Sequence, residues 1–294
     1  MRARRQTGRT IGRDGDEWAM VGEPNLSGRP SAPYVPAVPT FPLRSVRAAD
    51  PSRPEVWMSR LPRRVARWSG VALVALILAA PMPLAAQLPA GVTAGPWIDL
   101  LAGGAAPHWR TYREPSLESG WRYDATTKVL RRERGKDIIT KQQFGDFELE
   151  LEWKVGPKGN SGIFYRATEG TGVIYENAPE MQILDNVGHR DGGSPLTSAG
   201  ANYALHAPPR DVSKPAGEWN AVRLVAVGRH VEHWLNGVKL VEYEQGSPEW
   251  QALVAKSKFA AWPSYGRAMR GHIGLQDHGD VVEFRNIRIR ELSR

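Results

Sequence analysis

Three side chains that could transfer protons or bind hydroxyl groups stand together near the C-terminus: Gln276, Asp277 and His278. They follow a short apolar run that is typical of a β-strand. Alternation along that strand places Gln276 and His278 on one face, opposite Leu275. Two interpretations remain open: an acid-base site on the polar face, or a tight hairpin in which Asp277 and Gly279 supply the backbone conformations of a turn.

A second polar pair lies on another predicted strand. Glu180 and Gln182 are two residues apart and share a face, whereas Met181 and Ile183 point toward a core. A carboxylate beside an amide could act as a base and a hydroxyl binder, and the alternative is a polar row that faces solvent. Asp185 closes the strand, where it could bind a metal or cap the following loop.

Three further candidates are more isolated in the sequence. His233 could exchange protons near neutral pH, although a single strand histidine also serves as a structural hydrogen bonder. Arg166 ends a strand and could hold oxygen atoms with its fork of donors, or form a surface ion pair. Tyr203 lies in a loop rich in small residues, and loops at sheet ends often line binding sites.

The elements that must position these residues are mostly β-strands. The segment 147–155 alternates apolar and polar residues, as a strand with one solvated face should. Further predicted strands cover residues 161–166, 180–185, 220–227, 231–235 and 238–243. Asn236 and Gly237 separate the last two and favour a type I′ hairpin. The pattern therefore predicts an all-β sandwich.

One helix is predicted within this β-rich sequence. Ser247 is a suitable N-cap, Pro248 fits the first helical position, and residues 250–257 form the body. No internal repeat interrupts this pattern, so residues 87–294 are predicted to form one domain.

The charge of the chain is concentrated at its start. Of 294 residues, the first 86 contain 13 Lys and Arg against 6 Asp and Glu, so +7 of the total net charge of +8 lies there. The remainder is nearly neutral, and no nucleic-acid partner is therefore expected. Because the chain has no Cys, a disulfide framework and a Cys-ligated metal are excluded.

Residues 58–86 have the order of a secretory signal peptide. Arginines precede the apolar run 71–80, and Ala85 and Ala86 offer a cleavage site. The run has about ten residues where about twenty are needed to span a bilayer, so no permanent membrane anchor is expected. Residues 1–57 are read as a disordered extension from a start codon placed too early, since Met58 could open the signal. The alternative is a disordered cytoplasmic tail before an uncleaved signal anchor.

Several motifs resemble one family when they are taken in order. They are Phe144–Trp153, Gly159–Arg166, Glu180–Asn186, Gly217–Asn220, His233–Gly237 and Gly271–Ile289. Together, over roughly residues 96–292, they closely resemble the 3-keto-disaccharide hydrolase domain, also described as a 3-keto-glucoside 1,2-lyase with hydratase activity. The resemblance implies a concanavalin A-like jelly-roll β-sandwich and an exported enzyme, periplasmic or extracellular, that acts on oxidised glucosides or disaccharides.

The expected site combines the resemblance with the residue patterns. The predicted catalytic residues are Glu180, His233, Asp277 and His278, and the predicted substrate-binding residues are Asn160, Arg166, Gln182, Tyr203 and Gln276. No cofactor is certain, although a divalent metal near Asp185 stays open. Because no dinucleotide-binding glycine motif is found, a separate sugar 3-dehydrogenase must supply the ketone. The alternative function is a non-catalytic carbohydrate-binding module of the lectin type.

Overall fold

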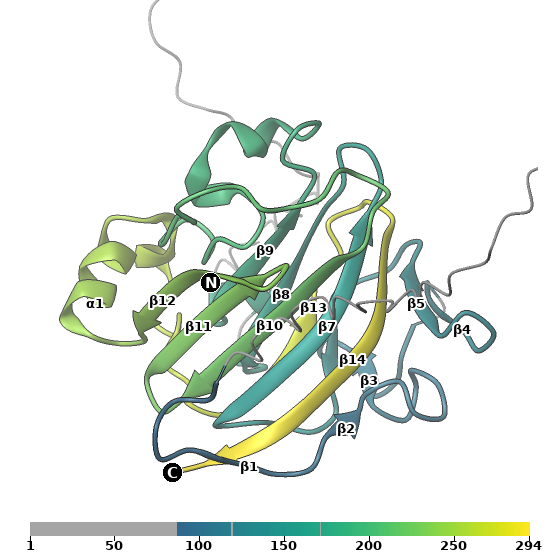
Figure 1. The fold of residues 1–294 in the computed structure, drawn as a ribbon, viewed down its shortest axis with the longest axis horizontal. Helices are drawn as coiled ribbons and strands as arrows, with labels where there is room; N and C mark the ends of the chain where they lie inside the picture. The colour runs from purple at the N-terminus through teal and green to yellow at the C-terminus, as the bar shows by residue number, and fades with distance from the viewer. Residues whose placement is uncertain (1–86, 119, 171) are drawn as a thin grey trace, which may run out of the picture. The chain divides into compact units, whose positions relative to one another are not determined.

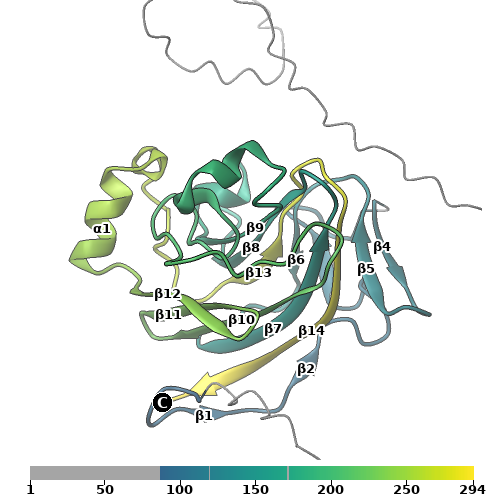
Figure 2. The ribbon, with the colours of Figure 1, turned by 45° about the horizontal axis from the view of Figure 1, so that its top comes forward.

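The computed structural model describes residues 87–118, 120–170 and 172–294, which form two antiparallel sheets packed face to face (Figures 1 and 2). The larger sheet has the order β12 (Val238–Glu244), β11 (His230–Leu235), β10 (Asn220–Val227), β7 (Phe147–Val155), β14 (Val282–Ser293), β5 (Val129–Arg132) and β4 (Trp121–Asp124). Strands β1 (Thr93–Ala94) and β2 (Ile98–Asp99) pair with β14. The smaller sheet has the order β3 (Trp109–Thr111), β6 (Ile138–Thr140), β13 (His272–Leu275), β8 (Asn160–Ala167) and β9 (Glu180–Leu184).

The main hydrophobic core lies between the two sheets. Strand β7 shows why, because Leu149, Leu151 and Trp153 are buried while Glu150 and Glu152 are half-exposed. Apolar side chains of the smaller sheet, such as Ile163 on β8, meet them from the other side. Burial of one such large apolar side chain contributes about 1.5–3 kcal/mol, so the alternating pattern fixes which face of each strand points inward.

A second, smaller apolar cluster lies on the outer side of the smaller sheet. Its members are Tyr112, Ile139, Phe164, Ala167, Ile174 and Ala178. Ile174 belongs to the 3-10 helix η1 (Ile174–Glu176), which covers this part of the sheet. The outer face of the smaller sheet is thus divided into a covered apolar part and a neighbouring polar part.

The predicted hairpin and helix are confirmed. Asn236 and Gly237 join β11 to β12 with φ values of 50° and 81°, as a type I′ turn requires. Helix α1 (Pro248–Ala255) begins at Pro248, and the Ser247 side chain accepts a hydrogen bond from the Trp250 amide. The helix ends two residues before the predicted position, because Ser257 instead caps the 3-10 helix η4 (Lys258–Ala261).

The all-β sandwich with one short α-helix, predicted from the sequence, is therefore confirmed. The predicted leader, both its extension (1–57) and its signal peptide (58–86), lies outside the described residues. Within residues 87–294, apart from the undescribed positions 119 and 171, no helix has the length and apolar character needed to cross a membrane.

Candidate functional site

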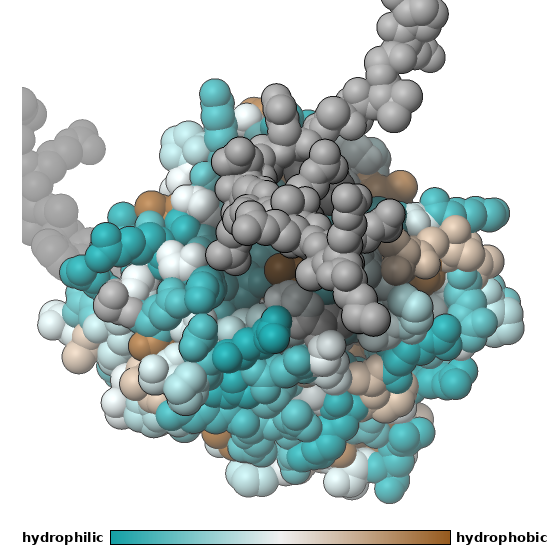
Figure 3. All heavy atoms as spheres, turned by 180° about the vertical axis from the view of Figure 1, so that it is seen from behind, coloured by the Kyte–Doolittle hydropathy of each residue, from teal (hydrophilic) through white to brown (hydrophobic). Residues whose placement is uncertain are grey.

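The outer face of the smaller sheet carries a group of polar side chains. Ile138, Leu275, Ile163 and Met181 are paired across β6, β13, β8 and β9, and all four point into the core. The residues directly before and after each of these four along the chain therefore point outward, to the other face of the sheet. We call this group the polar face: Asp137, Asn160, Glu180, Gln182, Gln276 and His278. Figure 3 views the molecule from the side of the smaller sheet, and the coloured surface toward the edges of this view is mainly hydrophilic.

Glu180 occupies a buried position on the polar face and is only 5% exposed. Its carboxyl lies over Gly162, where an added Cβ would come within 2.1 Å of Oε1, so glycine is needed there to leave room. No hydrogen bond to this carboxyl is formed by the described residues. Burial raises the pKa of Glu180 to about 8; the positive charge of Lys258 partly offsets this rise, and the like charge of Asp137 adds to it. Near neutral pH the group therefore holds a proton.

Amide oxygens without partners lie on the same face of the sheet as this carboxyl. Oε1 of Gln182, Oε1 of Gln276 and Oδ1 of Asn160 are buried, and none accepts a hydrogen bond from the part of the chain that is described. Gln182 is held in place because its Nε2 donates to the Thr197 carbonyl over 3.2 Å. A buried acceptor without a donor costs about 1–3 kcal/mol, so this arrangement suits a ligand that brings hydroxyl donors.

The loop after β9 and helix η4 supply two further side chains. The Tyr203 amide donates to the Glu180 carbonyl over 3.0 Å, which places the predicted Tyr203 beside the polar face. Burial and the nearby Glu180 raise the pKa of Tyr203 to about 12. The Lys258 ammonium lies 4.4 Å from the centre of the Tyr203 ring. Lys258 gave no signal in the sequence, because it lies in a short helix far along the chain from the strands of the site.

Asp137 is a member of the polar face that the sequence patterns missed. It immediately precedes β6, and its Oδ1 accepts a hydrogen bond of 2.8 Å from the Asp277 amide. Burial raises the pKa of Asp137 to about 7, in spite of this hydrogen bond. The available signal was its position two residues before Ile139, which puts both on the outer face by strand alternation.

Asp277 points away from the polar face, although the sequence placed it in the catalytic set. Alternation along the chain turns it opposite to Gln276, and it forms a buried ion pair with Arg132. Its Oδ1 also accepts a hydrogen bond from the Gly279 amide over 2.9 Å, as the turn interpretation expected. His278, by contrast, lies on the polar face with its Nε2 3.5 Å from the Asn160 side-chain nitrogen.

Arg166 also lies apart from Glu180. Its φ of 54° is left-handed, which breaks the alternation of β8 and turns the side chain inward. The guanidinium is buried and donates to Gln245 Oε1 over 2.8 Å and to the Gly228 carbonyl over 2.7 Å. A local break of this kind cannot be recognised from strand periodicity, so the sequence alone does not show that Arg166 turns inward.

His233 lies in the interior between the sheets and is fully buried. Its Nδ1 is 3.2 Å from the Gly200 carbonyl, which can only accept, so Nδ1 carries the hydrogen. Nε2 therefore accepts from the Tyr165 hydroxyl over 3.0 Å, and that hydroxyl accepts in turn from Tyr243. Burial lowers the pKa of His233 to about 3, so the ring stays neutral.

Asp185 makes the loop cap that was one of its two interpretations. Its carboxylate accepts hydrogen bonds from the amides of Lys158, Val187 and Gly188 over 2.7, 3.2 and 3.1 Å. Burial raises the pKa of Asp185, but the three amide donors outweigh that effect and lower it overall.

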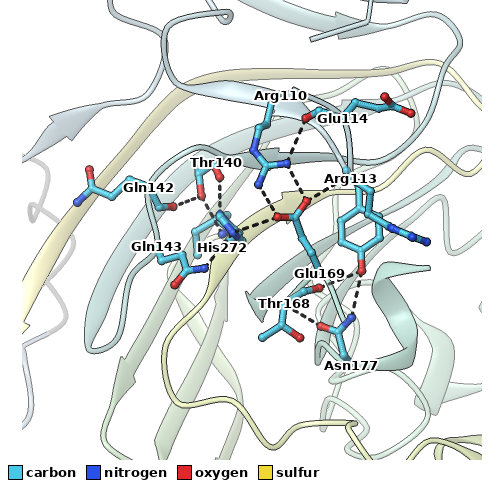
Figure 4. A network of polar contacts seen from close by, with 12 residues as sticks. Arg110, Arg113, Glu114, Thr140, Gln142, Gln143, Thr168, Glu169, Asn177 and His272 are labelled. Carbon is cyan, nitrogen blue, oxygen red and sulfur yellow. Dashed lines mark hydrogen bonds and ion pairs between the residues drawn. The ribbon is translucent and has the colours of Figure 1, made fainter. Parts of the chain in front are cut away.

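A separate polar network lies at the opposite end of β13 (Figure 4). Arg110 binds both carboxylate oxygens of Glu169 over 2.7 and 2.6 Å. His272 donates from Nδ1 to the Thr140 carbonyl over 2.6 Å, and its Nε2 accepts from Gln143 over 3.1 Å. Because these groups are hydrogen-bond and ion-pair partners of one another, we interpret the network as structural. It connects β3, β6 and β13 to the segment after β8.

The outer face of the larger sheet contains a groove of about 780 Å³ that includes Trp97 and Trp234. Arg288 lies 4.5 Å from the centre of the Trp97 ring, and Arg223 lies 5.3 Å from that of Trp234. Both indoles are thus already covered by cations that pair with glutamates, which makes this groove a weaker candidate than the polar face.

Comparison with known proteins identifies the family. Residues 96–290 match the 3-keto-alpha-glucoside-1,2-lyase-like domain. The chain belongs to this family. It is 36% identical over 239 residues to the 3-keto-disaccharide hydrolase of Bacteroides thetaiotaomicron, a match that covers 70% of this chain and 81% of that protein. Family membership confirms the resemblance found in the sequence and the expectation of an enzyme with a concanavalin-like sandwich.

Two solved structures of Parabacteroides distasonis proteins, both candidate glycosyl hydrolases, are similar to this member of the 3-keto-alpha-glucoside-1,2-lyase-like family. One has a TM-score of 0.62 and 30% identity and covers 67% of this chain and 94% of that chain. The other has a TM-score of 0.53 and 29% identity and covers 67% of this chain and all of that chain.

Proposed function

We propose that the protein cleaves 3-keto-glucosides by elimination across C1 and C2, followed by addition of water. A ketone at C3 acidifies the hydrogen on C2, so a base can remove that proton while the substituent at C1 leaves with a proton from an acid. Addition of water to the resulting 2-hydroxy-3-keto-glucal completes a net hydrolysis. The site for this chemistry needs proton-transfer groups and hydroxyl-binding groups on one face.

The observation that carries this proposal is the buried carboxyl of Glu180 among unpartnered amide oxygens. A carboxyl with a pKa of about 8 can donate a proton at neutral pH. The free oxygens of Gln182 and Gln276 can accept hydrogen bonds from sugar hydroxyls. The relative from Bacteroides thetaiotaomicron is a 3-keto-disaccharide hydrolase, which supports the same substrate class for this chain.

Within the proposal, Glu180 and His278 reach substrate on the polar face, together with Asn160, Gln182, Gln276 and Tyr203. His233, Asp277 and Arg166 act through other residues, because their side chains are held by interior or ion-pair partners. A divalent metal stays an open part of the proposal, and Asp185 could contribute to it only by giving up its loop hydrogen bonds.

The alternative function, a non-catalytic carbohydrate-binding module, requires exposed aromatic residues and no perturbed carboxyl on the binding face. The polar face contains two carboxyls, Glu180 and Asp137, whose pKa values are raised. These features favour an enzyme over a module that only binds.

The test is release of sugar from 3-keto-trehalose by the purified protein, with and without a chelator. Glu180→Gln is expected to reduce the rate about 10²–10⁴-fold, the range for loss of a general acid or base. Glu218→Gln, at an exposed carboxyl in the loop before β10, is the matched control and should retain full activity. Tight binding of the keto sugar without release, in the presence or absence of divalent metal, would support the binding module instead.

The proposal extends to where the protein works and what precedes it. The signal-like segment 58–86 supports export to the periplasm or the outside of the cell, and N-terminal sequencing of the mature protein should give Gln87 as its first residue. An intact Met58 or Met1 at the N-terminus of the mature protein would contradict cleavage. Since elimination needs a ketone already in place, a separate sugar 3-dehydrogenase must act first.

A further inference from the structure

We propose that Asp137 is a second catalytic carboxyl, which takes the proton from C2 of a 3-keto-glucoside while Glu180 protonates the departing oxygen. This assignment rests on the proposed function, and it gives the base of the reaction to a residue that neither the sequence patterns nor the family comparison singled out.

The positions of the two carboxyls carry the argument. Asp137 precedes β6, and the Glu180 carboxyl lies over Gly162 of β8, with Gln276 beyond the end of β13 between them. Two strand spacings separate β6 from β8, which is roughly 10 Å at the backbone. A pyranose ring placed above Gln276 would therefore have one carboxyl on each side, close to opposite edges of the ring.

The two carboxyls differ in their hydrogen bonds, and this difference indicates which is the base and which the acid. Asp137 accepts a hydrogen bond from the Asp277 amide over 2.8 Å, and a donor of this kind favours the ionised form of the carboxyl. Glu180 receives no hydrogen bond from the described residues and is more deeply buried, which favours the protonated form.

The proton balance of the pair supports the same assignment. The pKa of Asp137 is raised to about 7, mainly by burial, and that of Glu180 to about 8, by burial and in part by the negative charge of Asp137. The pair therefore holds one proton in common near neutral pH, and the hydrogen bond to Asp137 leaves that proton mainly on Glu180.

The two groups complete a balanced cycle. In the elimination, the C2–H bond breaks and its proton goes to Asp137, while the C1–O bond breaks and the leaving oxygen takes the proton of Glu180. A double bond forms between C1 and C2. In the hydration, ionised Glu180 takes a proton from water as the hydroxyl bonds to C1, and Asp137 returns its proton to C2. Both carboxyls regain their first state, and no other reactant than water is needed.

The experiment follows C2 exchange and bond cleavage separately in the full-length protein. Methyl 3-keto-glucoside is incubated in D₂O, and the loss of the C2 proton is followed by NMR above the uncatalysed rate. Asp137→Asn should reduce both exchange and cleavage about 10²–10⁴-fold. The variant keeps an oxygen that can accept the Asp277 amide, so the strand end should stay folded, which thermal unfolding checks.

Glu180→Gln gives the complementary result. It should retain C2 exchange within about tenfold but lose cleavage of the methyl glycoside. Cleavage of 4-nitrophenyl 3-keto-glucoside should be largely restored in this variant, because that leaving group departs without a proton. Asp124→Asn, at an exposed turn carboxyl on β4, is the control and should match the unmodified protein in every assay.

The outcomes separate the two levels of the proposal. If the unmodified protein neither exchanges C2 nor cleaves either glycoside, the proposed function is wrong. If it does both but Asp137→Asn retains exchange, the function stands and the role of Asp137 is overturned. Loss of exchange in Glu180→Gln with retention in Asp137→Asn would reverse the two roles and also contradict the assignment.

Discussion

Glu180 combines a chemical advantage with a cost in stability. The folded protein keeps a proton on this carboxyl up to a pH of about 8, whereas in the unfolded chain the same group has a pKa of about 4.5. Folding is therefore disfavoured by ionisation of Glu180, and the buried position is retained in spite of that effect. Strained or destabilised groups of this kind are typical of active sites.

The pH dependence of stability should reveal this effect. Between pH 4.5 and 8 the unfolded state releases the Glu180 proton and the folded state does not, so stability falls with rising pH and levels off above 8. Glu180→Gln removes this contribution. We expect the melting temperature of the variant to exceed that of the unmodified protein by an amount that increases from pH 5 to pH 8.

Thermal unfolding at several pH values measures that difference directly. Glu218→Gln, at an exposed carboxyl, should show a difference that does not vary with pH over the same range. A constant difference for Glu180→Gln as well would mean that the Glu180 carboxyl ionises normally in the folded state.

At the level of elements, the positions of the strands could be predicted from the sequence, but the places where a strand departs from regular alternation could not. Strands β7 and β10 have the bounds expected from alternation, and the Asn236–Gly237 hairpin follows from two residues that tolerate positive φ. The same rule correctly put Glu180 and Gln182 on one face. Alternation does not hold at Arg166, where the left-handed backbone turns the side chain to the inner face.

The pattern of a single strand also cannot show which of its two faces is buried by a second sheet. His233 alternates correctly, yet only the packing of β11 against the smaller sheet shows that its face is the interior. Asp137 was missed because its significance depends on pairing with Gln276 and Glu180 from strands distant in the sequence. The sequence thus predicted which residues lie on strands, but it could not predict which residues from different strands come together in the fold.

The loop that carries Tyr203 depends on the interior hydrogen-bond chain. His233 binds the Gly200 carbonyl, and the Gly200 and Tyr203 amides donate to the carbonyls of Gln182 and Glu180 on β9. Tyr165→Phe would leave His233 Nε2 without its donor. We expect a loss of about 1–3 kcal/mol in the free energy of unfolding, with faster hydrogen exchange at the Gly200 and Tyr203 amides.

Hydrogen exchange measured by NMR tests this coupling. The amide of Asn236, in the hairpin turn that follows β11, donates to the Ala221 carbonyl of β10 and serves as an internal reference. Faster exchange confined to the loop would support a positioning role for His233. Unchanged exchange at Gly200 and Tyr203 would show that the loop is held independently of the Tyr165 hydroxyl.

In the molecule as a whole, we expect the outer face of the smaller sheet to carry the function and the outer face of the larger sheet to contribute to stability. The polar face of the smaller sheet has buried polar atoms without partners, which suits substrate. The outer face of the larger sheet has a ladder of ion pairs instead, in which Glu148, Glu150 and Glu152 of β7 face Arg290, Arg288 and Arg285 of β14. The ladder satisfies its own charges and needs no ligand.

Glu148 is the member of this ladder on which stability should depend most. Its side chain is 3% exposed and lies between Arg290 and Arg223, whose own side chain is 11% exposed. Glu148→Gln would remove the carboxylate that accepts from Arg223 Nε and leave Glu232, 3.7 Å from Nη1, as the nearest carboxylate of that guanidinium. We expect a cost of about 1.5–3 kcal/mol, the range for a hydrogen bond to a charged group. Glu150→Gln on the same strand breaks a solvent-exposed pair with Arg288 and should cost less than about 1 kcal/mol.

Chemical denaturation of both variants gives the two free energies, and sugar release at low temperature gives their activities. Both variants should keep the activity of the unmodified protein per folded molecule, because the ladder lies on the sheet opposite Glu180. Glu180→Gln should behave in the reverse way, with stability kept or raised and activity lost. A Glu148→Gln variant that stays folded but loses activity would mean that the larger sheet takes part in the site, and the division between the two faces would fail.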